Sequence, residues 1–301
     1  MPVRPLPPPL AEKARVELNE DYKRLDESIR HLKEWILEQP HLRARTDDQW
    51  LAAFLRGCKF RLEQTKLKLD VYFSYRSKAP YLYSVNYFEP KCMDIINIGA
   101  TLILQKTVNP DDPRVILYRI GQYDPKVYTI CDIMAVLNLL QQICFMEDDN
   151  LVVAGTVNVI DLANTRLGHY TQLSFKQLRY LVEANQEAVP IRIKAIHFLN
   201  SPPFFATFFN ICKRFMNEKS KQRIMVHGKN LDSLHQHVPK EILPEEYGGT
   251  GENIKECTDY WKRKMSEYNS FFEDDLKYGS DETKRLPTTR SMPNKVPFEI
   301  D

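Results

Sequence analysis

The sequence predicts an α/β protein in which a small all-helical subdomain precedes a mostly parallel β-sheet flanked by helices. Apolar residues recur at helical spacing through residues 12–78, whereas after residue 90 short apolar runs alternate with segments of helix length. Strands that alternate with helices form parallel sheets covered by those helices. The expected divisions are a flexible proline-rich segment (1–10), a helical subdomain (11–90), an α/β domain (91–255) and a partly disordered C-terminal extension (256–301).

Three helices are expected in the front section. Residues 12–39 carry apolar side chains at alternating spacings of four and three, the period of an amphipathic helix, and Pro40 ends it. Thr46 or Asp47 caps a second helix, and the third covers about residues 62–78. In the rear section we expect strands at 102–104, 115–118, 157–161 and 193–199, and helices at 129–149, 174–188 and 204–216.

The composition argues against several classes of protein. With 42 basic and 40 acidic residues the net charge is +2, and no nucleic-acid-reading motif is present, so we expect no nucleic-acid partner. Nucleotide-binding and hydrolase motifs are absent, which disfavours an enzyme. Six cysteines without a CxxC pair, and no apolar leader, predict free thiols and a cytoplasmic protein. No uninterrupted apolar stretch is long enough to span a bilayer, so any membrane association is expected to be peripheral.

Two weaker candidates for chemistry are disfavoured. Asp161 ends a strand where catalytic acids occur in α/β folds, but a turn or capping role is the better interpretation. His235 and His237 could ligate a metal, yet they lack further ligands nearby in the sequence and are better explained as surface residues. We therefore predict no catalytic residue, no metal and no cofactor other than a bound ligand.

The segment 204–216, FFATFFNICKRFM, is the most informative feature. Its apolar side chains fall within an arc of roughly 160° of a helix. The segment is either an ordinary core helix or a movable lid over an apolar cavity. Exposing its five phenylalanines to water would cost about 7–15 kcal/mol, so such a lid would open only where lipid tails take the place of the protein around it. The residues concerned are Phe204, Phe205, Phe208, Phe209, Ile211, Cys212, Phe215 and Met216.

Basic residues flank this segment on both sides. Each Lys or Arg near an anionic leaflet contributes about 1 kcal/mol to membrane binding, so a convergent group would bind phosphoinositide head groups. The alternative is a scattered set of solvated charges. The residues are Arg192, Lys194, Lys213, Arg214, Lys219, Lys221 and Arg223, with Arg56, Lys59 and Arg61 in the helical front.

The chain resembles the CRAL-TRIO family over roughly residues 45–255. The resemblance rests on the segments FLRGCKF (54–60), PIRIKAIHFLN (190–200), EKSKQRI (218–224) and LPEEYGG (243–249), which occur in the family's order. Residues 118–119 and 124–128 are similar to the branch that contains the α-tocopherol transfer protein and the retinaldehyde-binding protein.

The resemblance implies an apolar cavity enclosed by the α/β domain and a mobile gate helix at residues 204–216, with Phe205, Phe209, Cys212, Phe215 and Met216 on it. It implies that Ile133, Met134, Leu137 and Gln141 line the pocket and that Ile160, Ile191, Phe204, Phe208 and Ile211 close it. A basic cluster of Arg192, Lys194, Lys219, Arg223 and Lys59 is expected to contact phosphoinositides. The family has glycine where Asn164 stands here, and asparagine tolerates the same left-handed turn.

The resulting hypothesis is a monomeric, non-enzymatic, cytoplasmic carrier that binds one hydrophobic molecule of the tocopherol, retinoid or carotenoid class. It would exchange that molecule at phosphoinositide-containing membranes. The alternative within the family is a phosphatidylinositol or phospholipid exchange protein. An enzyme acting on hydrophobic substrates and a membrane-recruited scaffold are the alternatives from other classes.

Overall fold

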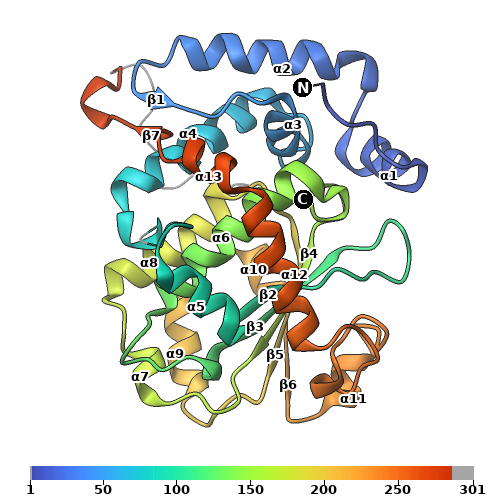
Figure 1. Ribbon diagram of the computed structural model, residues 1–301, viewed down its shortest axis with the longest axis vertical. Helices are drawn as coiled ribbons and strands as arrows, with labels where there is room; N and C mark the ends of the chain where they lie inside the picture. The colour runs from blue at the N-terminus through green and yellow to red at the C-terminus, as the bar shows by residue number, and fades with distance from the viewer. Residues whose placement is uncertain (1, 84, 287–301) are drawn as a thin grey trace.

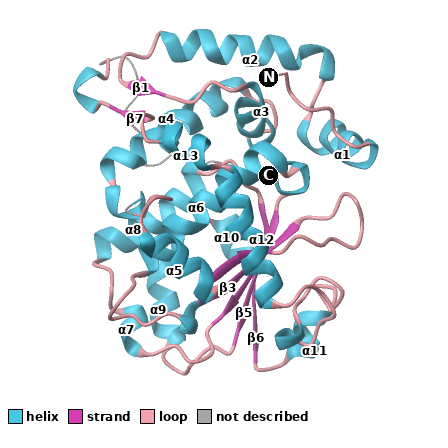
Figure 2. Ribbon diagram, viewed as in Figure 1, coloured by secondary structure: helices cyan, strands magenta, loops and turns pink. Residues whose placement is uncertain are grey.

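The computed structural model describes residues 2–83 and 85–286. The N-terminal helices form the top of the molecule as drawn in Figure 1, and the sheet lies in the lower half. In Figure 2 the long magenta strands lie in the lower half beside helices, and two short strands lie apart at the upper left. This arrangement confirms the fold class expected from the sequence.

The helical front contains α1 (Pro8–Leu18), α2 (Tyr22–Leu37), α3 (Asp48–Gly57) and α4 (Leu62–Lys78), followed by the 3₁₀ turn η1 (Pro80–Tyr83). The single helix expected over 12–39 is therefore two helices. The break has a local cause, because Asn19 ends α1 in the left-handed conformation (φ 59°) and the Asp21 side chain accepts a hydrogen bond from the Lys23 N–H to cap α2.

The proline-rich N-terminus is more ordered than the sequence analysis predicted. Helix α1 begins at Pro8, inside the segment expected to be flexible, since proline is well suited to the first turn of a helix. Leu10, Ala14 and Leu18, spaced by four, pack against the π-helical turn η3 (Asn150–Ala154) in a small separate apolar cluster. This packing places α1 beside the sheet domain.

The main sheet has the order β2-β3-β4-β5-β6. Strand β2 (Thr101–Ile103) is antiparallel to β3 (Arg114–Arg119), and β4 (Thr156–Asp161), β5 (Ile193–Leu199) and β6 (Ile224–Gly228) continue in parallel. The remaining helices of this domain are α5 (Pro90–Ile98), α6 (Ile130–Glu147), α7 (Leu167–Tyr170), α8 (Phe175–Glu183) with its π-helical extension η4 (Ala184–Ala188), α9 (Phe205–Cys212), α10 (Glu218–Gln222) and α11 (Leu231–His235).

Helix α6 is, within the part of the chain that the structure describes, long and apolar enough to cross a membrane. However, 72% of it is buried inside the fold. It packs against η1 and α3, with Ile133, Leu137 and Leu140 inside the main core. Such burial is typical of the central helix of a globular core.

The C-terminal extension joins both halves of the protein. Helices α12 (Ile254–Glu267) and α13 (Asn269–Asp275) lead to β7 (Gly279–Ser280), which pairs antiparallel with β1 (Leu42–Arg43) in the helical front. Trp261 is buried and donates a hydrogen bond from Nε1 to the Ile103 carbonyl. Up to residue 286 the extension is therefore structured, and the expectation of partial disorder also falls on residues 287–301, which lie outside the described residues.

Candidate functional site

The helix expected to act as a gate, hereafter the gate helix, consists of α9 followed by the 3₁₀ turn η5 (Lys213–Phe215). Phe205 and Phe209 are its buried side chains, and their rings stack on each other at 5.2 Å and pack against Phe198 of β5. With Leu162 they form a cluster of their own, separate from the main core. The gate helix is thus attached to the sheet by a small independent set of apolar contacts.

Two of the phenylalanines expected to close the pocket are only partly buried. Phe204 is 39% exposed and Phe208 is half-buried, and both rings contact Tyr170 of α7 edge-on at 4.9 and 5.0 Å. The buried phenylalanines are instead Phe205 and Phe209, which periodicity alone placed on the same apolar arc. An arc of roughly 160° does not tell which of its members point at the sheet, and only packing against Phe198 decides this.

The sheet face under the gate helix is incompletely packed. Ile160 of β4 lies beside Phe198 in the register and contacts both the main core and the gate cluster, yet it is only partly buried. Ile196, two residues before Phe198 on the same face, is also partly buried. Cys212, Met216 and Ile211 of the gate helix are half-buried, and the first two border the same cluster. Apolar side chains from strand and helix therefore meet here without forming a closed core.

The expected pocket residues on α6 divide into two groups. Ile133 and Leu137 are fully buried in the main core, and Ile191 is buried there as well. Met134 and Gln141 line a small cavity of about 20 Å³ between α6, η1 and the α8–η4 segment. A space of that size holds about one water molecule and no lipophile.

The basic cluster is partly neutralised by α1. Arg192 is only 3% exposed; its guanidinium donates to the Val153 carbonyl and lies 3.4 Å from Glu17 Oε2. Lys194 Nζ lies 3.2 Å from the same carboxylate oxygen. Burial works against the charge of Glu17, but Lys194 holds the pKa of this carboxyl below its usual value. No sequence pattern signals this contact, since Glu17 stands 175 residues before Arg192 in the chain.

Two glycines allow other segments to approach the backbone closely at Pro190 and Arg192. A Cβ at Gly57 would lie 2.4 Å from the Pro190 carbonyl oxygen, and one at Gly155 2.2 Å from the Arg192 carbonyl oxygen, so only glycine permits these approaches. Gly57 precedes Lys59 in the loop after α3. Arg223 donates to the Ile193 carbonyl at 2.5 Å, at the start of β5. Lys219 lies one turn before Arg223 on α10.

The disfavoured catalytic and metal candidates have structural partners. Asp161 is buried and accepts hydrogen bonds of 2.8 Å from the Ala163 N–H, Asn200 Nδ2 and the Tyr247 hydroxyl, which supports the turn role. The turn that follows Asp161 contains Asn164 at φ 61°, the left-handed conformation expected for this substitution. His235 Nε2 lies 2.8 Å from the Tyr247 carbonyl oxygen, so this residue is not simply a surface histidine. Within the described ranges, no group of three or more His, Cys, Asp or Glu side chains is placed so that it could hold a metal ion.

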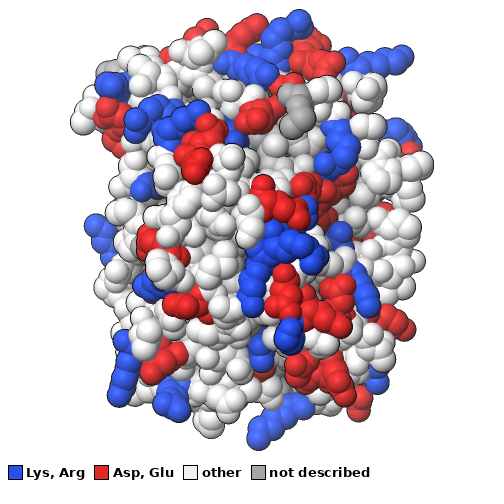
Figure 3. All heavy atoms as spheres, in the orientation of Figure 1, with Lys and Arg blue, Asp and Glu red and all other residues white. Residues whose placement is uncertain are grey.

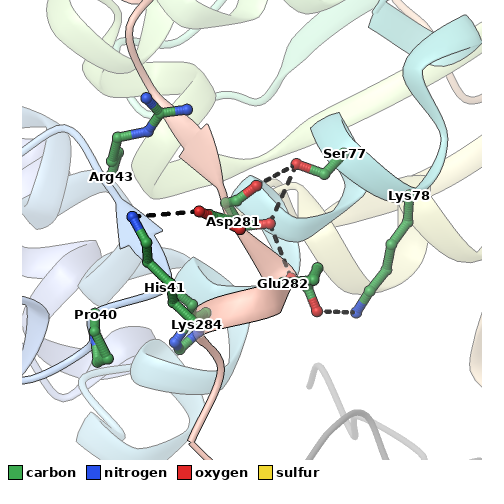
Figure 4. A pocket seen from close by; sticks show the side chains of 9 residues that line it. Pro40, His41, Arg43, Ser77, Lys78, Asp281, Glu282 and Lys284 are labelled. Carbon is green, nitrogen blue, oxygen red and sulfur yellow. Dashed lines mark hydrogen bonds and ion pairs between the residues drawn. The ribbon is translucent and has the colours of Figure 1, made fainter.

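Two surface hollows border the elements described so far. A groove of about 380 Å³ lies between α9 and β6, with Phe205 and Phe209 on one wall and Lys213 and Lys221 at its edge. Figure 4 shows a second hollow, of about 460 Å³, between β1, the end of α4 and the β7 segment. Its lysines pair with its own acids, Lys78 with Glu282 at 3.4 Å among them, and these charged walls do not suit an apolar ligand. On the face shown in Figure 3, basic and acidic side chains lie near one another.

The α/β sheet, the separately packed gate helix and the adjoining basic residues define a lipid-binding class of protein. Comparison with known proteins agrees. Residues 101–249 match the family profile described as CRAL/TRIO domain, and residues 21–91 match one described as Pinta-like, UBA domain. Clavesin-2 of Rattus norvegicus is 31% identical over 298 residues, covering 98% of this chain and 87% of the relative. The chain belongs to the CRAL-TRIO family of lipid-binding and lipid-transfer proteins.

Further similarities are consistent with this assignment. Clavesin-1 of Xenopus laevis is 30% identical over 81% of this chain and 74% of its own length. The crystal structure of Sfh5 has the same fold, with a TM-score of 0.51 and 15% identity over 84% of this chain and 92% of that chain. The clavesins support the family and Sfh5 supports the fold, and neither supports the tocopherol and retinaldehyde branch in particular.

Proposed function

We propose that this protein is a monomeric, non-enzymatic carrier that holds one hydrophobic molecule of the tocopherol, retinoid or carotenoid class between the gate helix and the sheet. The observation that carries the proposal is the separate apolar cluster under the gate helix. Opening it exposes Phe205 and Phe209 fully, at about 3–6 kcal/mol, less than the cost for all five phenylalanines. The half-buried Ile160 and Ile196 offer an apolar surface for the ligand.

The basic cluster supports exchange at phosphoinositide-containing membranes and therefore a cytoplasmic protein with peripheral membrane association. Three cations of the cluster lie at the start of β5, the strand whose Phe198 packs against the gate helix. They are Arg192, Lys194 and Arg223. Docking at this point would bring the gate helix to the leaflet, where lipid tails would surround the phenylalanine rings that leave the sheet.

Native mass spectrometry of the purified protein, followed by solvent extraction, tests the proposal. One small lipophile per chain is the expected result, and a diacyl phospholipid would favour the phospholipid-exchange alternative. Ile160→Trp should block uptake, whereas Leu37→Trp, an exposed position at the end of α2, should not. A protein that stays empty after exposure to retinoids, tocopherols, carotenoids and phospholipids would refute the carrier function.

A further inference from the structure

The C-terminal end of the gate helix is held by one side chain of the π-helical turn η4. Gln186 Oε1 accepts a hydrogen bond from the Asn217 N–H at 2.9 Å, and Gln186 Nε2 donates to the Phe215 carbonyl at 3.1 Å. These two backbone groups flank Met216, where the chain leaves the 3₁₀ turn and enters α10. A single amide therefore satisfies both polar groups at the joint of the gate helix.

The turn that carries Gln186 is itself anchored in the helical front. Lys68 of α4 is fully buried, and its ammonium group donates to the backbone carbonyls of Glu187 at 2.8 Å, Val189 at 3.3 Å and Gln186 at 3.4 Å. A cation at the C-terminal end of a helix satisfies carbonyls that have no partner within the helix. The position of Gln186 is thus set by a helix of the front subdomain.

The other contacts of the gate helix are of a different kind. Phe204 and Phe208 touch Tyr170, Phe215 touches Phe175 at 5.7 Å, and Phe205 packs on Phe198, all through rings. Apolar contacts are non-directional, and the hydrocarbon region of a membrane can replace them. It cannot replace hydrogen bonds to a carbonyl and an N–H, because lipid tails carry no donor or acceptor.

We propose that Gln186 is a positioning residue that holds the C-terminal end of the gate helix in its closed place, and that these two hydrogen bonds break when the gate opens. Its functional consequence is that breaking these two hydrogen bonds sets the rate of ligand exchange, and this consequence rests on the proposed carrier function. Its structural content, the local anchoring of residues 205–217, does not depend on the identity of the ligand.

Hydrogen–deuterium exchange of the full-length protein, without added lipid, tests the anchoring. Gln186→Met keeps the side-chain length and removes both hydrogen bonds, so amides in 205–217 should exchange about tenfold faster, which corresponds to about 1.4 kcal/mol. Gln186→Glu keeps the acceptor for Asn217 and loses the donor for Phe215, and should give a smaller increase. Arg179→Met removes an exposed ion pair with Glu183 on α8 and serves as the matched control, which should behave as wild type.

Unchanged exchange of the gate amides in Gln186→Met would overturn the proposal. So would an increase that spreads equally to β4 and β5, because that reports general loosening. If Gln186→Met does not fold, Gln186→Glu decides by the same criterion.

A transfer assay with a fluorescent tocopherol between phosphatidylcholine vesicles separates this proposal from the carrier function. Faster release from Gln186→Met than from Arg179→Met is the expected result. Equal release rates in the two variants would overturn the link between anchoring and exchange. A wild-type protein that transfers no lipophile would refute the carrier function, while a localised increase in amide exchange would still support the role of Gln186.

Discussion

Glu17 is expected to restrain membrane binding, because its carboxylate forms ion pairs with two of the cations proposed to bind phosphoinositides. It lies 3.2 Å from Lys194 and 3.4 Å from Arg192, and it is itself partly exposed. An anionic head group must compete with it for both cations. Neutralising this carboxylate in Glu17→Gln should therefore increase binding to phosphoinositide-containing membranes.

The magnitude follows from the exposure of the pair. The pair with Lys194 joins two partly exposed groups, and such ion pairs contribute about 0.2–1 kcal/mol, so releasing Lys194 contributes at most about 1 kcal/mol. This corresponds to about fivefold tighter binding. Lys194→Ala should have the opposite effect, also about 1 kcal/mol, because it removes one cation from the leaflet.

Sedimentation with phosphatidylcholine vesicles, with and without phosphatidylinositol bisphosphate, measures the change. Glu12→Gln is the matched control, since Glu12 lies on the same helix, carries the same charge and pairs with Arg15 instead. If Glu17→Gln binds no more tightly than Glu12→Gln, then Glu17 does not mask the cluster. A gain in binding that survives high salt unchanged would also contradict the electrostatic reasoning.

Three further results are expected. Phe209→Ala should lower the free energy of unfolding by about 3 kcal/mol in urea titrations. The same substitution at the more exposed Phe204 should lower it by less than about 1 kcal/mol. Equal losses would contradict the assigned orientation of the gate helix. Burial and two neighbouring histidines lower the pKa of His197 to about 4, so its contribution to stability is complete above pH 6.5 and is lost, by at most about 3 kcal/mol, as the pH falls toward 4. In His197→Gln the urea midpoint should depend less on pH over that range. A pH dependence equal to that of the wild type would argue against the lowered pKa of His197. Tyr247→Phe removes the hydroxyl that donates a 2.8 Å hydrogen bond to buried Asp161. The variant should lose about 1–3 kcal/mol of unfolding free energy, measured by thermal unfolding, without a change in lipid transfer. An unchanged melting temperature would exclude a stabilising role for this hydrogen bond.

Local patterns in the sequence were sufficient for the fold class and the family. Strand and helix periods are set by the backbone, so the runs at 115–118, 157–161 and 193–199 were recognisable without any tertiary information. The family was recognisable from the resemblance of a few short segments, and the comparisons confirm the family though not the branch. The left-handed turn at Asn164 was also predictable, because it depends on one residue and its neighbours.

Contacts between distant parts of the chain were not predictable in this way. The spacing of the gate helix defined an apolar arc, but only the position of Phe198 on β5 determined that Phe205 and Phe209 are the buried pair. The sequence suggested a basic cluster, and only the fold placed Glu17 against it and Gln186 at the end of the gate helix. A hydrophobic period is local to one helix, whereas the partner of a charge or an amide depends on which remote segments pack together. The sequence by itself therefore determined the class of protein, and the tertiary structure decided which of its residues restrain the site.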